Sequence, residues 1–166
     1  MSPRLLAASG THSPGFDLLL IGHVACALIG FGAIVTSGVQ AARLRRSVGA
    51  VGAGLRRYFA PGINWVGRAL YGVPLFGLAL LADSGSRFRL GEGWVETGLV
   101  LWALAAGAAE TAMWPAERRI QAALLAGDGT VSGGSVGRDC LVVVVLASVL
   151  GAVFLVATVV MVARPS

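Results

Sequence analysis

Charged residues are scarce in this 166-residue sequence: they make up 13% of it, against roughly 25% in an average soluble domain. Lysine is absent, histidine and cysteine occur twice each, and 56% of the residues are hydrophobic. So few polar groups could not cover a globular protein in water, and a mean hydropathy of +0.80 excludes intrinsic disorder. The composition predicts an integral membrane protein with one membrane domain, residues 1–166.

Motifs that would identify an enzyme are also scarce. The sequence has no HExxH motif and no Cys-x-x-Cys spacing for zinc. It is too short for the paired inverted repeats of typical secondary transporters. We therefore expect a non-enzymatic protein without a cofactor or a metal site.

About 20 apolar residues cross a bilayer core of roughly 30 Å as a helix, and four stretches come near that length. We expect an all-α, four-helix transmembrane bundle with spans at residues 18–42, 60–82, 94–116 and 140–163. The first and last spans carry no charge, whereas the middle two include Arg68, Glu96 and Glu110. A re-entrant hairpin is the alternative for these two. Crossing is favoured because Trp94 and Trp114 are spaced to reach both membrane interfaces.

The arginines predict the orientation of the chain. Eight of the thirteen lie in the first and third connections: Arg43, Arg45, Arg46, Arg56, Arg57, Arg118, Arg119 and Arg138. Four others, Arg4, Arg87, Arg89 and Arg164, fall on the opposite side. Cytoplasmic loops collect basic residues, so both termini are expected outside, in a multi-pass protein of a bacterial inner (plasma) membrane. The first span is expected to be retained, since its apolar run is too long for a signal peptide.

The first connection has an apolar stripe at helical spacing: Leu44, Val48, Val51, Leu55 and Phe59. This pattern predicts a short interfacial helix whose arginines contact anionic lipid headgroups: Arg43, Arg45, Arg46, Arg56 and Arg57. The alternative is a flexible basic loop, which Gly49, Gly52 and Gly54 favour. Lipid contact accounts for the positive charge, and no nucleic-acid partner is needed.

Arg68 and Glu110 are the charges placed deepest in the expected spans. Each lies about 10 Å inside the cytoplasmic end of its helix, at 1.5 Å per residue. A charge inside a bilayer is costly unless it is paired, so we expect an intramembrane ion pair between Arg68 and Glu110. The alternative is that Arg68 extends to the headgroups while Glu110 is protonated or hydrogen-bonded.

His23 is the histidine within a span, about 9 Å below the expected outer surface. It could ligate haem or copper, with His12, Met113 or Met161 as a conceivable second ligand. The alternative is a hydrogen-bonding residue in the bundle. Cys26 and Cys140 lie at different depths, which argues against a disulfide and for small packing residues.

Small residues repeat every four positions in two spans, as Gly22, Cys26 and Gly30 and as Ala147 and Gly151. Such faces let helices approach closely, within the bundle or in a homodimer or larger membrane complex. Pro74 and Pro115 remove backbone donors, and this frees the carbonyl groups of Leu70 and Thr111. We expect a kink at each proline.

The sequence resembles a family of small bacterial integral membrane proteins of unknown function, distantly similar to the membrane domain of copper-resistance D proteins. The matching elements are Leu-Leu-Ile-Gly-His-Val at residues 19–24, the arginine-rich connection, Pro61-Gly62, and Trp-Pro-Ala-Glu-Arg-Arg at residues 114–119. The resemblance covers roughly residues 16–125 and implies a four-helix membrane domain. It transfers no catalytic residues, and the metal-binding side chains of the copper-linked proteins are largely missing here.

Two functions follow as expectations. The first is a non-enzymatic accessory or scaffold subunit that acts through its helix faces and its basic cytoplasmic surface. The alternative is a small transport or redox subunit, linked to haem or copper, that uses His23 and the layer formed by Arg68 and Glu110.

Overall fold

The computed structural model describes residues 14–47, 51–84, 90–127 and 134–163, and every secondary-structure element in these ranges is helical. The elements are α1 (Pro14–Arg46), α2 (Ala53–Tyr58), η1 (Gly67–Tyr71), α3 (Gly72–Asp83), α4 (Gly93–Ala108), η2 (Ala109–Met113), α5 (Trp114–Ala126) and α6 (Gly134–Ala163). The element η1 is a 3-10 helix and η2 is a π-helix. The expected all-α class is confirmed for the described residues.

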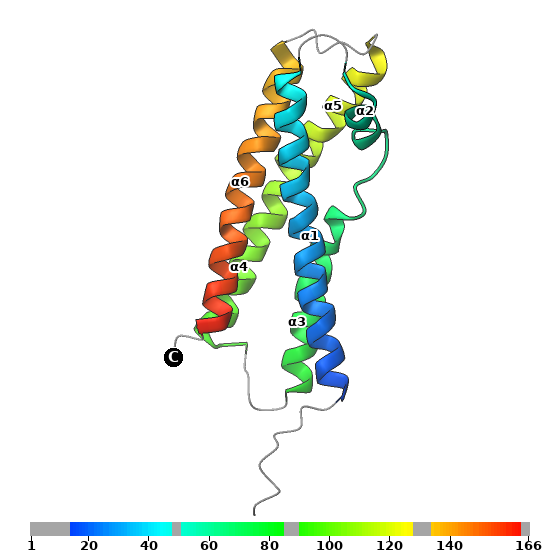
Figure 1. Cartoon of the computed structure of the whole chain (residues 1–166). Helices are drawn as coiled ribbons and strands as arrows, with labels where there is room; N and C mark the ends of the chain where they lie inside the picture. Colours follow the sequence, from blue (N-terminus) through cyan, green and yellow to red (C-terminus); the bar gives the residue numbers. More distant parts are fainter. Residues whose placement is uncertain (1–13, 48–50, 85–89, 128–133, 164–166) are drawn as a thin grey trace, which may run out of the picture.

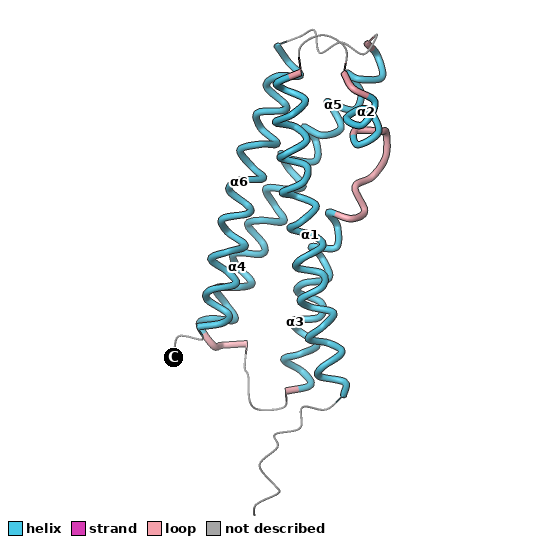
Figure 2. Tube along the Cα trace, in the orientation of Figure 1, coloured by secondary structure: helices cyan, strands magenta, loops and turns pink. Residues whose placement is uncertain are grey.

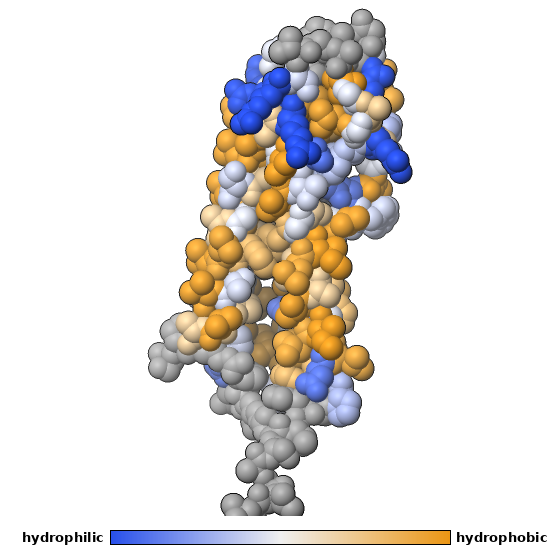
Figure 3. Space-filling view, in the orientation of Figure 1, coloured by the Kyte–Doolittle hydropathy of each residue, from blue (hydrophilic) through white to orange (hydrophobic). Residues whose placement is uncertain are grey.

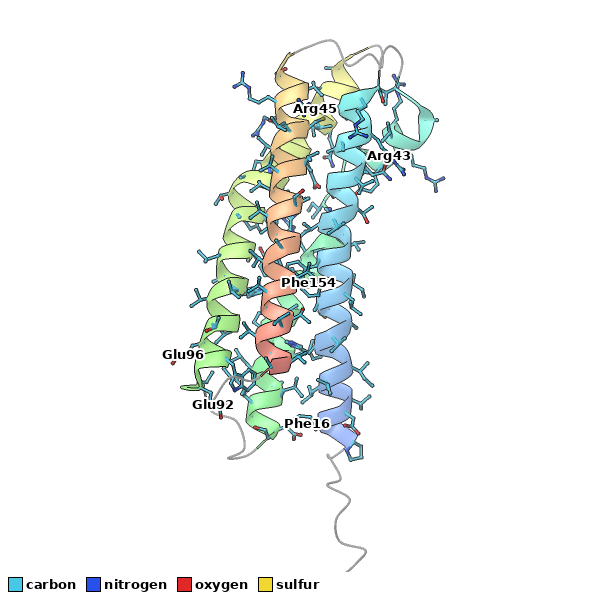
Figure 4. All side chains as sticks on the ribbon, turned by 60° about the vertical axis from the view of Figure 1, so that its left-hand side comes forward. Phe16, Arg43, Arg45, Glu92, Glu96 and Phe154 are labelled. Atoms are coloured by element: carbon cyan, nitrogen blue, oxygen red, sulfur yellow. The ribbon has the colours of Figure 1, made fainter. Side chains whose placement is uncertain are left out.

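The long helices run alternately up and down the molecule (Figure 1). Helix α1 rises to the end that carries α2 and α5, α3 returns, α4 rises again and α6 returns. We call the end with α2 and α5 the basic end, because Figure 3 shows its hydrophilic residues gathered there. Arg43 and Arg45 lie at this end, whereas Phe16, Glu92 and Glu96 lie at the opposite end (Figure 4).

Within the described residues, three helices are long and apolar enough to cross a membrane, namely Pro14–Arg46, Gly93–Ala126 and Gly134–Ala163. Many of the exposed side chains on these helices are large and apolar; Leu18 and Val162, for example, are 69% and 79% exposed. Surfaces of this kind are typical of proteins in contact with lipid rather than water. The structure is therefore compatible with a membrane protein.

The expected span at residues 60–82 is shorter in the structure. Its first seven residues form a non-helical connection after α2, drawn as a loop in Figure 2. Pro61 and Gly62 disfavour a helix, and the Asn64 side chain then accepts a hydrogen bond of 2.9 Å from the N–H of Gly67, where η1 begins. The helical part, η1 with α3, is roughly 28 Å long, which is close to the thickness of a bilayer core.

The first connection contains a shorter helix than its apolar stripe predicted. Helix α2 has six residues, and Val51 and Phe59 on either side of it are buried at 6% and 3% exposure. Arg56 and Arg57 are exposed. Val48 and Gly49 lie outside the described residues. The stripe therefore packs this connection against the helices and leaves its described arginines outward.

Small residues bring the long helices into contact, as the repeat in α1 indicated. A Cβ atom added at Gly22 would meet the ring of Phe76. A Cβ atom added at Gly30 would lie 2.6 Å from the backbone nitrogen of Leu70. Cys26, between them, packs on Gly72. This face of α1 is thus covered by η1 and α3, and both cysteines are free, as expected.

The second small-residue face joins α1 to α6 near the basic end. A Cβ atom at Gly38 would collide with that of Ala147, and Gly151 faces Val35. Phe31 and Phe154 stack at the middle of the molecule with ring centroids 4.4 Å apart (Figure 4). Beyond this pair, toward the opposite end, α1 with α3 draws apart from α4 with α6 (Figure 1).

Candidate functional site

Arg68 and Tyr71 project from the same side of η1 toward the π-helix η2. A 3-10 helix has three residues per turn, so side chains at positions i and i+3 align. Tyr71 donates a hydrogen bond of 2.5 Å to Oε1 of Glu110 in η2. The Arg68 guanidinium lies 5.2 Å from the ring centroid of Trp114 and 5.6 Å from that of Trp65. Two irregular helical segments thus form one polar and aromatic cluster.

The expected ion pair between Arg68 and Glu110 is replaced by contacts through aromatic residues. Tyr71 donates a hydrogen bond to the Glu110 carboxylate, and the Arg68 guanidinium forms a cation–π contact with the ring of Trp114. Within the described part of the chain, the salt bridge is instead Arg119 Nη2 to Asp139 Oδ1 at 2.8 Å, between α5 and α6. Arg68 and Glu110 thus belong to one cluster, and the sequence pattern did not indicate its member Tyr71.

The π-helix η2 lies directly before the position at which Pro115 predicted a kink. Pro115 cannot donate to the carbonyl of Thr111, and the π-helix ends two residues before it. The Thr111 hydroxyl donates to the Gly107 carbonyl at 2.7 Å. Trp114 is 4% exposed and packs inward.

A second polar cluster lies nearer the basic end and joins α1, α2 and α5. A hydrogen bond of 2.7 Å connects Ser37 Oγ and Tyr58 Oη, and Glu117 lies beside them, 5% exposed. Burial raises the pKa of Tyr58 above 10.0; the hydrogen bond with Ser37 lowers it, and the nearby Glu117 charge raises it. Sequence analysis missed this cluster, because single Ser, Tyr and Glu residues show no spacing pattern.

Two buried polar atoms face a small cavity between these clusters. Trp114 Nε1 and Glu117 Oε1 have no hydrogen-bond partner among the described residues. Both residues line a cavity of about 30 Å³, together with Asn64, Arg68 and Arg118. A space of this size accommodates one water molecule, which can accept from the indole and donate to the carboxylate.

A larger cavity lies in the half of the molecule away from the basic end, between all four long helices. Its volume is about 430 Å³, within the roughly 300–1,000 Å³ of small-molecule sites. The lining comes from residues 16–31 of α1, 73–81 of α3, 94–102 of α4 and 153–162 of α6. Figure 3 shows the molecule hollowed here. Phe31 and Phe154 are the stacked pair at its inner end.

Apolar side chains make up nearly all of this lining. Its polar side chains are His23, Trp94, Trp102 and Thr158. His23 Nδ1 is 2.9 Å from the Val73 carbonyl oxygen. Gly77 leaves room for the ring, because a Cβ atom added at Gly77 would lie 3.3 Å from Cε1 of His23. The structure therefore places His23 on the wall of a cavity, hydrogen-bonded to α3.

The residues considered as metal ligands are not brought together. No group of three or more His, Cys, Asp or Glu residues that could hold a metal ion occurs among the described residues. Met161 lines the same cavity as His23, but Met113 is fully buried elsewhere in the core. His12 lies outside the described residues.

Comparison with known proteins adds no relative. No family model matches the chain, and neither does any curated protein or solved structure.

Proposed function

We propose that this chain is a non-enzymatic accessory protein of a bacterial inner membrane that holds a lipophilic ligand between its four helices. The observation that carries the proposal is the cavity of about 430 Å³ lined by α1, α3, α4 and α6. A scaffold subunit with no ligand would gain more stability from close packing along its whole length, because interiors normally leave few voids.

The contrast between the two halves of the molecule supports this reading. Near the basic end, Ile34, Leu44 and Val143 are no more than 1% exposed, so the helices pack tightly there. In the other half, the cavity wall includes Leu20, Leu28 and Leu78, which are at least 43% exposed. Apolar walls in a membrane favour an apolar occupant, such as a hydrocarbon chain, over water.

The arginines support an orientation with the basic end at the cytoplasmic face. Arg43, Arg45, Arg46, Arg56 and Arg57 are exposed at that end, where anionic headgroups would attract them. Both termini would then lie outside, with η1 and α3 as the fourth crossing. The resemblance to the family related to copper-resistance D proteins also favours a four-helix membrane domain.

A melting experiment tests ligand binding. The protein is stripped of lipid in detergent, and a total lipid extract of the expression host is added back. A ligand that binds the folded state raises the melting temperature. We expect the rise in the wild-type protein and in Ala152→Phe, whose site on α6 is exposed and outside the cavity lining. Ala157→Phe places a ring inside the cavity, where it competes with the ligand, and should abolish the rise. An equal rise in Ala157→Phe would contradict the proposal.

A metal or haem site at His23 is the second candidate, because His23 and Met161 line the same cavity. This function would be a small redox or transport subunit in which the cluster of Arg68, Tyr71 and Glu110 moves charge. Metal analysis and Soret absorbance of the purified protein test it. Stoichiometric iron or copper that disappears in His23→Leu would favour this function over lipophile binding.

A further inference from the structure

We infer that the cavity selects an uncharged amphiphile with a hydroxyl group, of the long-chain or isoprenoid alcohol class, whose hydroxyl donates to Nε2 of His23. This inference rests on the proposed function, and it names the ligand class. The hydrogen-bonding state of each polar side chain on the cavity wall carries the argument.

His23 offers an acceptor to the ligand. The Val73 carbonyl can only accept, so the proton of a neutral imidazole resides on Nδ1, 2.9 Å from that oxygen. The other nitrogen, Nε2, is then an acceptor, and it has no hydrogen-bond partner among the described residues.

Among the described residues, the polar side chains on the wall leave no donor for the ligand. Trp102 Nε1 donates to the Leu70 carbonyl at 3.0 Å, and Trp94 Nε1 donates to Glu92 Oε2. The Thr158 hydroxyl donates to the Phe154 carbonyl at 2.8 Å and retains only acceptor capacity. A ligand that can only accept, such as a ketone or an ether, would therefore find no partner.

The shape of the cavity sets the position of the rest of the ligand. His23 lies partway along α1 between Phe16 and Phe31, both of which line the cavity. With the hydroxyl at His23, a hydrocarbon chain can extend along the apolar walls toward the stacked rings of Phe31 and Phe154. None of the described residues on the wall carries a charged side chain, so among them a charged headgroup would be left unpaired.

Tryptophan fluorescence tests the inference, since Trp94 and Trp102 lie on the cavity wall. The probes are a long-chain alcohol brominated on its tail and the methyl ether of the same alcohol. Bromine quenches a tryptophan that it contacts. We expect saturable quenching by both probes, with the alcohol binding roughly 3- to 10-fold more tightly, as one neutral hydrogen bond contributes.

Three variants complete the experiment. His23→Leu should bind the alcohol and the ether equally, Ala157→Phe should bind neither, and Ala152→Phe should behave as the wild type. Equal affinity of the wild-type protein for both probes overturns the hydroxyl inference and leaves the cavity proposal standing. Unsaturable quenching by both probes overturns the cavity proposal as well. The wild-type comparison decides the inference even if a variant fails to fold.

Discussion

The indole N–H of Trp102 in α4 donates to the carbonyl oxygen of Leu70 in η1 at a distance of 3.0 Å. Pro74 lies four residues after Leu70 and has no N–H, so the usual helical partner of this carbonyl is missing. A side chain from another helix replaces it. The bond ties η1 to α4 beside the larger cavity, where both Pro74 and Trp102 line the wall.

Loss of this indole donor should destabilise the protein unless the carbonyl regains a helical partner. Trp102→Phe removes the indole donor to the buried Leu70 carbonyl, and we expect a cost of about 0.5–1.5 kcal/mol in unfolding free energy. In a Pro74→Ala background, the new N–H at position 74 can bond to Leu70, so Trp102→Phe should cost less. A double-mutant cycle in detergent measures the coupling. Additive losses would contradict this assignment.

The close contact between α1 and α6 should tolerate no side chain at Gly38. Gly38→Leu places a Cβ atom against Ala147, and overpacking of this kind costs about 1–3 kcal/mol or more. Gly32→Leu is the matched control on the same helix, because nothing lies within 4 Å of a Cβ atom there. Thermal unfolding should show a lower midpoint for Gly38→Leu alone. Similar midpoints for the two variants would show that α1 and α6 do not meet here.

Exchange of the charges at positions 68 and 110 should not restore stability. Arg68 stacks on Trp114 and Glu110 accepts from Tyr71, so Arg68→Glu and Glu110→Arg each break a different interaction. We expect the double variant to be no more stable than the sum of the single losses predicts. Tyr71→Phe should also weaken the protein. A double variant that recovers most of the lost stability would instead indicate a direct ion pair.

Tyr58 should ionise at higher pH in the folded protein than after unfolding. Burial and Glu117 raise its pKa above 10.0, and the hydrogen bond with Ser37 opposes this shift. The stability from the neutral phenol is therefore complete below pH 10 and is lost as pH rises through the folded-state pKa. Tyr71→Phe leaves Tyr58 as the single tyrosine for an absorbance titration.

Ser37→Ala, in the Tyr71→Phe background, tests the direction in which the hydrogen bond shifts the pKa of Tyr58. Removal of the hydrogen bond that lowers the pKa should move the midpoint further upward. A midpoint that falls, or one that matches the unfolded protein, would contradict the buried position of Tyr58.

Cysteine labelling in intact cells tests the orientation. Ala82→Cys and Ala126→Cys place exposed thiols at the end of α3 and at the end of α5, in a background without Cys26 and Cys140. With the basic end in the cytoplasm, an impermeant maleimide should label position 82 at once and position 126 only after permeabilisation. The reverse labelling pattern would show that the basic end lies outside the cell.

The patterned features of the fold follow from the sequence. Long apolar runs predicted α1 and α6, and the four-residue repeat of Gly22, Cys26 and Gly30 predicted a close helix contact. The predicted start at Ala60 differs from the observed start of η1, because apolarity extends back to Ala60 whereas Pro61, Gly62 and the turn at Asn64 delay the helix. The length of an apolar run indicates whether a segment suits a lipid environment, whereas Pro, Gly and side-chain hydrogen bonds to the backbone decide where the helix begins.

The candidate sites were less predictable, because they depend on how far helices separate. His23 was identified as unusual, but its contact with Val73 and the cavity beside it require the relative positions of α1 and α3. Arg68 and Glu110 were placed at one depth by counting residues. Their aromatic partners depend on the 3-10 geometry of η1 and the π geometry of η2. No periodicity in the sequence predicts either geometry.

Native mass spectrometry of the protein released from mild detergent tests the central claim most directly, by counting the lipophilic molecules retained on each chain. We predict one tightly retained uncharged lipophile on the wild-type protein and on Ala152→Phe, and none on Ala157→Phe. Equal retention by all three proteins, or no retained molecule on the wild-type protein, would contradict a ligand site between the helices.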